Sequence, residues 1–222
     1  MKKPHSETIE QTIKILLQQK SLYMNTALMD VQEHYKNPFH VLISCILSLR
    51  TKDAVTAIAS KKLFALADTP KDLLRLKPDQ IERAIYPAGF YKTKARTIQN
   101  ICKIILEKFQ GNVPTRYEDL LALPGVGPKT AAIVMVYGHN ICEHIPCDSH
   151  VHQIANRLGW VKTKKPEDTE HALKNIIPKK YWKDLNDLLV QFGQNICVPV
   201  SPWCSKCPVA PYCLKISVQK HR

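Results

Sequence analysis

Apolar side chains recur every three or four positions through most of this chain, which is the spacing of one face of an α-helix. The longest such segment covers residues 92–109, and a second amphipathic segment covers residues 8–17. The shared face of the longer segment consists of Ala95, Ile98, Ile101, Cys102, Ile105 and Phe109. Alternation at the period of a β-strand is rare. The pattern therefore predicts an all-α fold.

Helix start and stop signals divide this pattern into elements. Thr69 followed by proline is typical of an N-cap, and residues 115–118 have the sequence of a capping box. Gly89 is expected to end a helix over residues 79–87, and Gly111 to end the helix over 92–109. No repeat or flexible linker appears, so any domain division must arise from the chain folding back on itself.

Two glycines interrupt the helical pattern at residues 123–130, LPGVGPKT. A helix over 115–121 enters this turn and another begins at Pro128, which predicts a helix-hairpin-helix. The glycines allow close approach to the backbone, and the amides of the turn suit a DNA phosphate without regard to base sequence. The residues expected at this contact are Gly125, Val126, Gly127 and Thr130. A plain αα-hairpin is the alternative.

Composition supports a polyanionic partner. The 222 residues are 45% hydrophobic, enough for one large or two modest cores, and carry a formal net charge of +13 without a long Lys/Arg run. A basic surface spread over a folded body favours nucleic acid. A membrane is disfavoured because no apolar stretch reaches 18 residues. A basic protein without a polyanionic partner is the alternative.

Four cysteines near the end of the chain have the spacing C-x6-C-x2-C-x5-C: Cys197, Cys204, Cys207 and Cys213. Thiolates this close in sequence can converge on one metal centre at modest entropic cost. Structural zinc sites usually have two tight pairs, whereas one pair with longer arms favours an iron–sulfur cluster. Zinc is the second interpretation and disulfides the third. The other cysteines lack a framework spacing and are typical of reduced thiols in a cytosolic protein.

Lys129 and Asp148 are the candidate catalytic residues. Lys129 follows the hairpin turn, where the positive end of the helix and partial desolvation both favour a neutral, nucleophilic amine. A phosphate-binding lysine is the alternative. Asp148 lies nineteen residues later and either caps the following helix or stabilises positive charge at C1′ during cleavage of an N-glycosidic bond.

These motifs resemble the endonuclease III family of DNA glycosylases, in the helix-hairpin-helix Gly/Pro-Asp superfamily. The resemblance extends to ILSLRTKD at 46–53, GFYKTKA at 89–95, DSHV at 148–151 and NRLG at 156–159. It implies that Lys129 is the Schiff-base nucleophile, that Asp148 is the general aspartate, and that the four cysteines hold a [4Fe-4S] cluster. It also implies a six-helix barrel over residues 30–135 and a cluster domain made of residues 1–29 and 136–222.

The resemblance implies a monomeric enzyme that acts on double-stranded DNA with damaged pyrimidines or abasic sites. It would remove oxidised pyrimidines and cleave the abasic site by β-elimination. Arg50 stands where relatives often have glutamine, and either fills the gap left by the flipped nucleotide or holds phosphate. The loop 198–203 lacks basic residues, so Lys206 is the expected DNA contact there.

Two other functions remain open at this stage. A monofunctional mismatch glycosylase for thymine or adenine usually lacks the hairpin lysine, and a non-catalytic cluster or zinc module leaves the pairing of Lys129 with Asp148 unexplained. The first residues carry no apolar signal-peptide region. We therefore expect a cytoplasmic, nucleoid-associated, prokaryotic protein.

Overall fold

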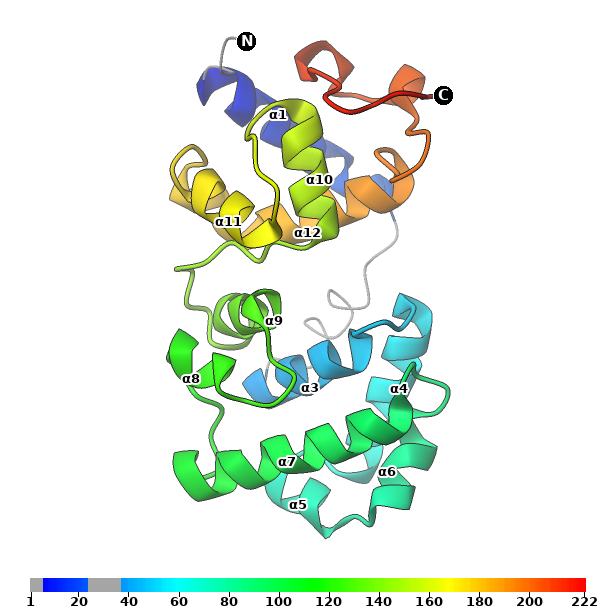
Figure 1. Cartoon of the computed structure of the whole chain (residues 1–222), viewed down its shortest axis with the longest axis vertical. Helices are drawn as coiled ribbons and strands as arrows, with labels where there is room; N and C mark the ends of the chain where they lie inside the picture. Colours follow the sequence, from blue (N-terminus) through cyan, green and yellow to red (C-terminus); the bar gives the residue numbers. More distant parts are fainter. Residues whose placement is uncertain (1–5, 24–36) are drawn as a thin grey trace. The chain divides into compact units, whose positions relative to one another are not determined.

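The computed structural model describes residues 6–23 and 37–222, which form helices and connecting turns without a β-strand among them (Figure 1). They fall into two compact units, each with its own hydrophobic core. One unit contains residues 37–143, and the other contains residues 6–23 and 144–222. The predicted all-α fold is confirmed. The predicted domain boundary after residue 29 lies outside the described residues, and the naming of the units as barrel and cluster domains stays a prediction.

Helix α3 (Pro38–Ser48) is the centre of the unit 37–143. Every residue from Phe39 to Leu47 is buried, because this helix is apolar on nearly all sides, with His40 and Ser44 as its buried polar residues. It contacts four elements of its unit, α4 (Asp53–Leu66), α7 (Tyr91–Phe109), α9 (Pro128–Ile133) and the turn η2 (Val134–Gly138). Helices α5 (Pro70–Arg75) and α6 (Pro78–Ile85) pack against α7. The helix α3 is therefore the element around which this unit packs.

Two of the predicted helix boundaries are confirmed by local hydrogen bonds. Thr69 caps α5, because its side-chain oxygen accepts a hydrogen bond from the Asp72 amide at 3.1 Å. Gly111 has a φ of +85° after α7, and its amide donates to the Ile105 carbonyl at 3.0 Å. This bond is typical of a glycine that closes a helix C-terminus.

Two other predicted boundaries are wrong. Helix α8 (Tyr117–Leu121) begins after Arg116, whose side chain makes no cap hydrogen bond, so there is no capping box at residues 115–118. Helix α6 ends at Ile85 and not near Gly89. The cause of the earlier end is Pro87, because the residue before a proline avoids the helical conformation.

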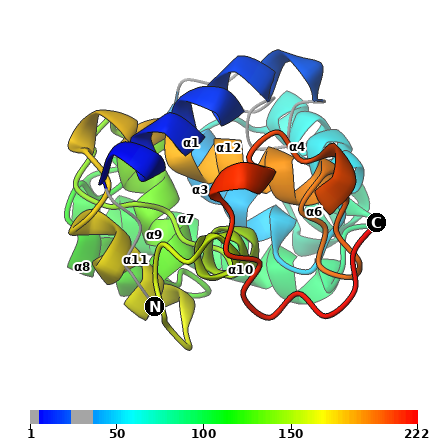
Figure 2. The ribbon, with the colours of Figure 1, turned by 90° about the horizontal axis from the view of Figure 1, so that it is seen from above.

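The second unit joins the two ends of the chain. Helix α1 (Ser6–Gln19) contacts α12 (Trp182–Asn195), as Figure 2 shows. Helix α10 (Ser149–Leu158) packs on α12 and on α11 (Pro166–Lys174). The core combines side chains of all these helices with one from the C-terminal segment, and its members include Ile9, Ile13, Ile154, Leu189 and Val209.

Short 3-10 turns complete this unit at η1 (Lys20–Leu22), η3 (Lys179–Tyr181), η4 (Cys204–Lys206) and η5 (Ala210–Tyr212). Within residues 6–23 and 37–222, no helix is both long and apolar enough to cross a membrane.

Candidate active site and cluster pocket

The predicted helix-hairpin-helix is formed by α8, a turn and α9. The Tyr117 hydroxyl donates to the Pro128 carbonyl at 3.3 Å and so ties the second helix to the first. Gly125 has a φ of +76°, which a side chain would strain. Gly127 is the N-cap of α9 in extended backbone, and a Cβ at this position would meet no atom within 4 Å. The turn is therefore open to an approaching partner at Gly127.

The backbone of this turn has unused donors. Neither the Gly125 amide nor the Gly127 amide donates a hydrogen bond to another group in the described part of the chain. The side chains of Val126 and Thr130 are buried. A contact between DNA and these two residues would therefore use their main chain.

Lys129 is the second residue of α9, and its side chain is exposed. Burial raises the pKa of the Cys45 thiol in α3 to about 12, and the positive charge of Lys129 opposes this increase. Lys129 therefore lies at the exposed N-terminal end of α9, next to the hairpin turn, while the later residues of this helix are buried. After Ile133 the helix continues as the π-helical turn η2 (Val134–Gly138), whose first three residues are buried.

Asp148 is the N-cap of α10, as the simpler interpretation predicted. Its Oδ1 accepts hydrogen bonds from the amides of His150 and Val151, both at 2.9 Å. These two bonds hold the carboxylate in one orientation at the start of the helix. Lys129 belongs to the unit 37–143 and Asp148 to the other unit, so each residue is placed within its own unit.

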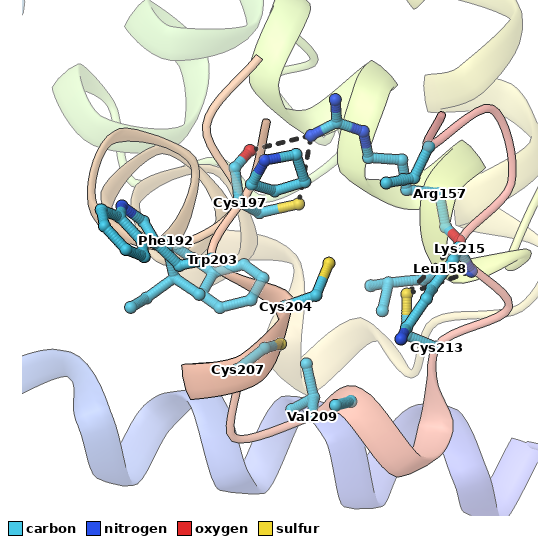
Figure 3. A pocket seen from close by; sticks show the side chains of 14 residues that line it. Arg157, Leu158, Phe192, Cys197, Trp203, Cys204, Cys207, Val209, Cys213 and Lys215 are labelled. Carbon is cyan, nitrogen blue, oxygen red and sulfur yellow. Dashed lines mark hydrogen bonds between the residues drawn. The ribbon is translucent and has the colours of Figure 1, made fainter. Parts of the chain in front are cut away.

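All four C-terminal cysteines line one pocket, shown in Figure 3. Cys197 follows α12, Cys204 begins η4, Cys207 directly follows η4, and Cys213 follows η5. Each of these thiols is free rather than in a disulfide, which excludes the disulfide interpretation. Among the residues described, no group of three or more His, Cys, Asp or Glu side chains is arranged so that it could hold a metal ion. The cysteines surround a space and do not meet at a point.

Arg157 of α10 holds the loop that carries the first of these cysteines. Its side chain is buried, and its guanidinium donates to the carbonyls of Cys197, Val198 and Pro199 at 2.6–3.1 Å. The guanidinium also donates to the Cys197 sulfur at 3.4 Å (Figure 3). The sequence motif at 156–159 predicted no role for Arg157. Its position in the sequence nevertheless indicated a buried partner, because Arg157 is a charged residue next to Leu158 on the apolar face of a helix.

The donor set of the pocket fits an iron–sulfur cluster. The Lys215 amide donates to the Cys213 sulfur at 3.4 Å, so two of the sulfurs accept N–H hydrogen bonds, an arrangement that tunes cluster sulfurs. Burial raises the pKa of the Cys207 thiol to about 11. Burial also raises the pKa of the Cys197 and Cys213 thiols. Such thiols give up their protons when a positive metal centre binds them.

The remaining predicted DNA contacts are at the surface. Arg50 follows α3 with a φ of +53°, and its guanidinium lies 5.6 Å from the centre of the Phe90 ring. The Lys206 ammonium lies 5.1 Å from the centre of the ring of Trp203, which lines the pocket of the four cysteines. Both side chains are exposed.

An all-α fold with a helix-hairpin-helix and a downstream aspartate defines a class of DNA repair proteins, and comparison with known proteins agrees. The family model described as HhH-GPD superfamily base excision DNA repair protein matches residues 43–179. Endonuclease III of Thermotoga maritima is 47% identical, over 80% of this chain and 83% of that protein. The chain spans about half the length of mammalian and plant relatives that it matches.

Two solved structures share the fold. A non-covalent endonuclease III–DNA complex has a TM-score of 0.84 and 30% identity, over 95% of each chain. A trapped endonuclease III–DNA covalent intermediate has a TM-score of 0.75 and 34% identity, over 81% of this chain and 84% of that chain. The chain therefore belongs to the endonuclease III family of the HhH-GPD superfamily.

Proposed function

We propose that Lys129 and Asp148 carry the chemistry of this enzyme, a bifunctional DNA glycosylase and abasic-site lyase of base excision repair. The observation that supports this assignment most strongly is the position of Lys129. It is an exposed amine in the first turn of α9, directly after a hairpin turn with open backbone amides. A relative in this family forms a covalent complex with DNA that can be trapped, which requires a nucleophile of this kind.

The reaction uses one amine for two steps. The neutral amine of Lys129 attacks C1′ of the damaged nucleotide, the bond from C1′ to the base breaks, and the base leaves with a proton. The C1′–O4′ bond of the sugar ring then breaks, O4′ takes up a proton, and C1′ and the lysine nitrogen form a protonated imine. This imine makes the C2′ proton acidic, and removal of that proton expels the 3′ phosphate. Asp148 stabilises positive charge on the sugar while the bond to the base breaks, and its two backbone hydrogen bonds fix the carboxylate for this task. The substrate class is oxidised pyrimidines in double-stranded DNA.

The hairpin turn holds the DNA backbone. The amides of Gly125 and Gly127 donate to phosphate oxygens, and Val126 and Thr130 contribute main-chain contacts. Arg50 and Lys206 contact DNA from exposed positions. Together with a net charge of +13, these contacts give binding that does not depend on base sequence.

The four cysteines hold a [4Fe-4S] cluster. The supporting observation is that all four line one pocket in which two of the sulfurs already accept N–H hydrogen bonds. When bound, such a cluster cross-links the C-terminal segment to the rest of its unit. Arg157 orients the first ligand by fixing the loop that begins at Cys197.

Borohydride trapping on a duplex that contains thymine glycol tests this proposal, because it reports the damaged base and the imine together. We expect the parent protein to form a covalent complex and Lys129→Gln to form none, while its affinity for the duplex is kept. Lys71→Gln is the matched control, since Lys71 is an exposed lysine of α5 and its loss changes the net charge equally.

Two outcomes would contradict the proposal in different ways. If Lys129→Gln cleaved an abasic duplex at the parent rate, the lysine would be a phosphate contact and not the nucleophile. If the parent protein released the base without any trapped complex, the enzyme would be a monofunctional glycosylase.

A further inference from the structure

Lys94 is a buried lysine in the first turn of α7, with a side chain that is 6% exposed. Its Nζ lies 2.6 Å from the Leu47 carbonyl oxygen, 2.7 Å from the Leu49 carbonyl oxygen and 2.7 Å from Oγ1 of Thr51. An ammonium group has three donors, and here each has an acceptor. Burial lowers the pKa of Lys94 to about 8, which still leaves the side chain mostly charged at neutral pH. Burying a charge costs desolvation free energy, so a buried lysine is retained where the hydrogen bonds that it donates are needed.

The acceptors of Lys94 lie where the central helix of the unit ends. Leu47 is in the last turn of α3 and Leu49 is its C-cap, so both carbonyls are in the region where a helix leaves acceptors without partners. A cation is also favoured at this end of a helix by the helix dipole. Lys94, which belongs to a neighbouring helix, therefore caps the C-terminal end of α3 from a position more than forty residues away in sequence.

Thr51 extends this contact to a second loop. Its hydroxyl accepts from Lys94, accepts from the Gly89 amide at 3.0 Å, and donates to the Leu49 carbonyl at 3.3 Å. A Cβ at Gly89 would lie 2.4 Å from the Arg50 carbonyl oxygen. The loop that follows α3 and the loop that precedes α7 are therefore held together by two contacts. One is the set of hydrogen bonds of the Thr51 hydroxyl, and the other is the close approach of Gly89 to the Arg50 backbone.

Arg50 lies in the loop that these two contacts hold. Its φ of +53° is in the left-handed region that residues other than glycine rarely adopt. Phe90, in the facing loop, has a φ of +56°, and its ring lies under the Arg50 guanidinium. Backbone conformations of this kind persist where surrounding contacts over-determine them. The Lys94 and Thr51 contacts provide that constraint on both sides of Arg50.

We propose that Lys94 is a positioning residue for DNA recognition, because it holds the turn after α3 in the conformation that presents Arg50 to the duplex. This inference rests on the proposed function, in which the exposed Arg50 contacts DNA, and it takes the first of the two roles that the resemblance allows for Arg50, filling the gap left by the flipped nucleotide. A pre-ordered arginine loses less conformational freedom when it binds, so the ordered turn strengthens binding of the distorted duplex. Lys94 itself touches neither DNA nor the reacting atoms.

A double-mutant cycle with Arg50 tests the proposal. The probe is a duplex with a tetrahydrofuran abasic analogue opposite 2-aminopurine, whose fluorescence rises when the opposite base unstacks. Lys94→Met removes the three donors, and Thr51→Val removes the shared hydroxyl with little change of shape. Thr51→Ser keeps the hydroxyl and is the matched control. Each variant is made in the parent protein and in Arg50→Ala, and thermal unfolding is followed in all of them.

We expect Lys94→Met and Thr51→Val to weaken binding of this duplex about tenfold and to reduce the fluorescence rise in the parent background. In the Arg50→Ala background each should weaken binding less than about twofold, because the residue that they position is absent. Thr51→Ser should behave as the parent. If Lys94→Met does not fold, the comparison of Thr51→Val with Thr51→Ser decides the same question.

Equal losses in both backgrounds would mean that Lys94 acts independently of Arg50, and would overturn the positioning role. An Arg50→Ala protein with parent affinity would overturn it as well. Cleavage of a natural abasic duplex by the parent is measured in parallel. If the parent fails to cleave, the proposed function is wrong, whereas cleavage with an additive cycle removes only the role of Lys94.

Discussion

Asp148 accepts two backbone hydrogen bonds at the start of α10, and the same contacts hold its carboxylate in a fixed direction. The capping role and the proposed catalytic role are therefore compatible in one side chain. An N-cap needs an oxygen acceptor, whereas stabilisation of a cationic sugar needs negative charge. Substitutions that keep the acceptor and remove the charge can separate the two roles.

Asp148→Asn should slow excision of thymine glycol by about 10²- to 10⁴-fold and leave the fold nearly unchanged, since asparagine also caps helices well. Slow cleavage of a preformed abasic site should remain, because Lys129 is intact. Asp148→Ala should show the same loss of excision and also lose about 0.5–2 kcal/mol of stability. Single-turnover rates on damaged and abasic duplexes, with urea unfolding of each variant, measure this. A normal excision rate for the asparagine variant would leave Asp148 only its capping role.

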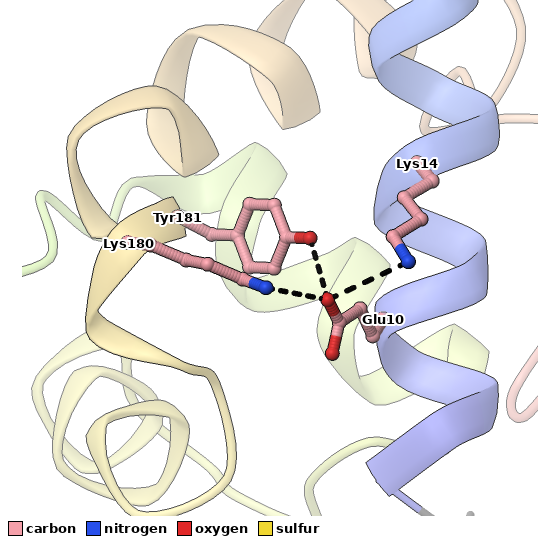
Figure 4. A network of polar contacts seen from close by, with 4 residues as sticks. All are labelled: Glu10, Lys14, Lys180 and Tyr181. Carbon is pink, nitrogen blue, oxygen red and sulfur yellow. Dashed lines mark hydrogen bonds and ion pairs between the residues drawn. The ribbon is translucent and has the colours of Figure 1, made fainter.

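At the scale of elements, α1 is tied to the C-terminal half of its unit by Glu10 (Figure 4). Its carboxylate accepts hydrogen bonds from the Lys180 ammonium at 2.7 Å and the Tyr181 hydroxyl at 2.8 Å, both in η3. Lys14 adds a weaker ion pair at 3.7 Å. The Lys180 and Tyr181 contacts lower the pKa of Glu10 from 4.5 to about 2.

This network predicts a pH-dependent part of stability. The folded form of Glu10 binds its proton less readily than the unfolded form, so the stabilisation is fully present above pH 4.5 and is lost as the pH falls towards 2. Glu10→Gln should therefore be less stable than the parent at pH 7, with a difference that shrinks between pH 5 and pH 2. Urea unfolding at several pH values measures it. Glu7→Gln, at an exposed site in the same helix, is the control and should show a smaller difference.

The hairpin turn gives a second prediction at this scale. Gly127→Ala should leave the thermal unfolding temperature nearly unchanged, because a Cβ at that position meets no atom within 4 Å. It should nevertheless weaken binding of undamaged duplex, since the methyl group occupies the space where phosphate approaches. Binding of the parent should fall with salt, with a log–log slope of about −0.9 for each phosphate contact. Binding that does not respond to salt, or to Gly127→Ala, would contradict a backbone phosphate site at this turn.

At the scale of the whole molecule, the cluster pocket concerns folding more than chemistry. The four cysteines belong to the unit that also contains Asp148, while Lys129 belongs to the other unit. The loop between Cys197 and Cys213 consists of short 3-10 turns with few side chains in the core, Val209 being one of them. Such a segment gains stability from a cross-link at its centre.

Anaerobically purified protein should therefore be brown and contain about four irons per chain. Cys207→Ala should lose the iron and make the C-terminal segment sensitive to proteolysis, before any direct effect on the catalytic residues. Metal analysis and limited proteolysis measure these outcomes, with Cys102→Ala as a control that removes a buried thiol outside the pocket. Stoichiometric zinc without iron would contradict the cluster.

Much of the site was predictable because its signals are local. The hairpin glycines, the lysine after them, the capping aspartate and the cysteine spacing all lie within short segments, and helix periodicity gave the all-α fold. Predicted boundaries failed at α6 and α8, where one proline and one missing cap decided the ends. The exposed position of Lys129 agrees with the apolar sequence that follows it, because residues 130–136 are buried and only the N-terminal end of the helix meets solvent.

The sequence by itself determined the helical fold, the hairpin and the candidate chemistry, since each depends on residues close together in the chain. Tertiary structure decided which charged residues are buried, because burial depends on partners that are distant in sequence. Arg157 reaches the cysteine loop forty residues away, and Lys94 reaches the end of α3 across more than forty. Both lie beside apolar helix positions, so the sequence could mark them as unusual. Only the fold supplies the carbonyl groups that make an interior charge stable.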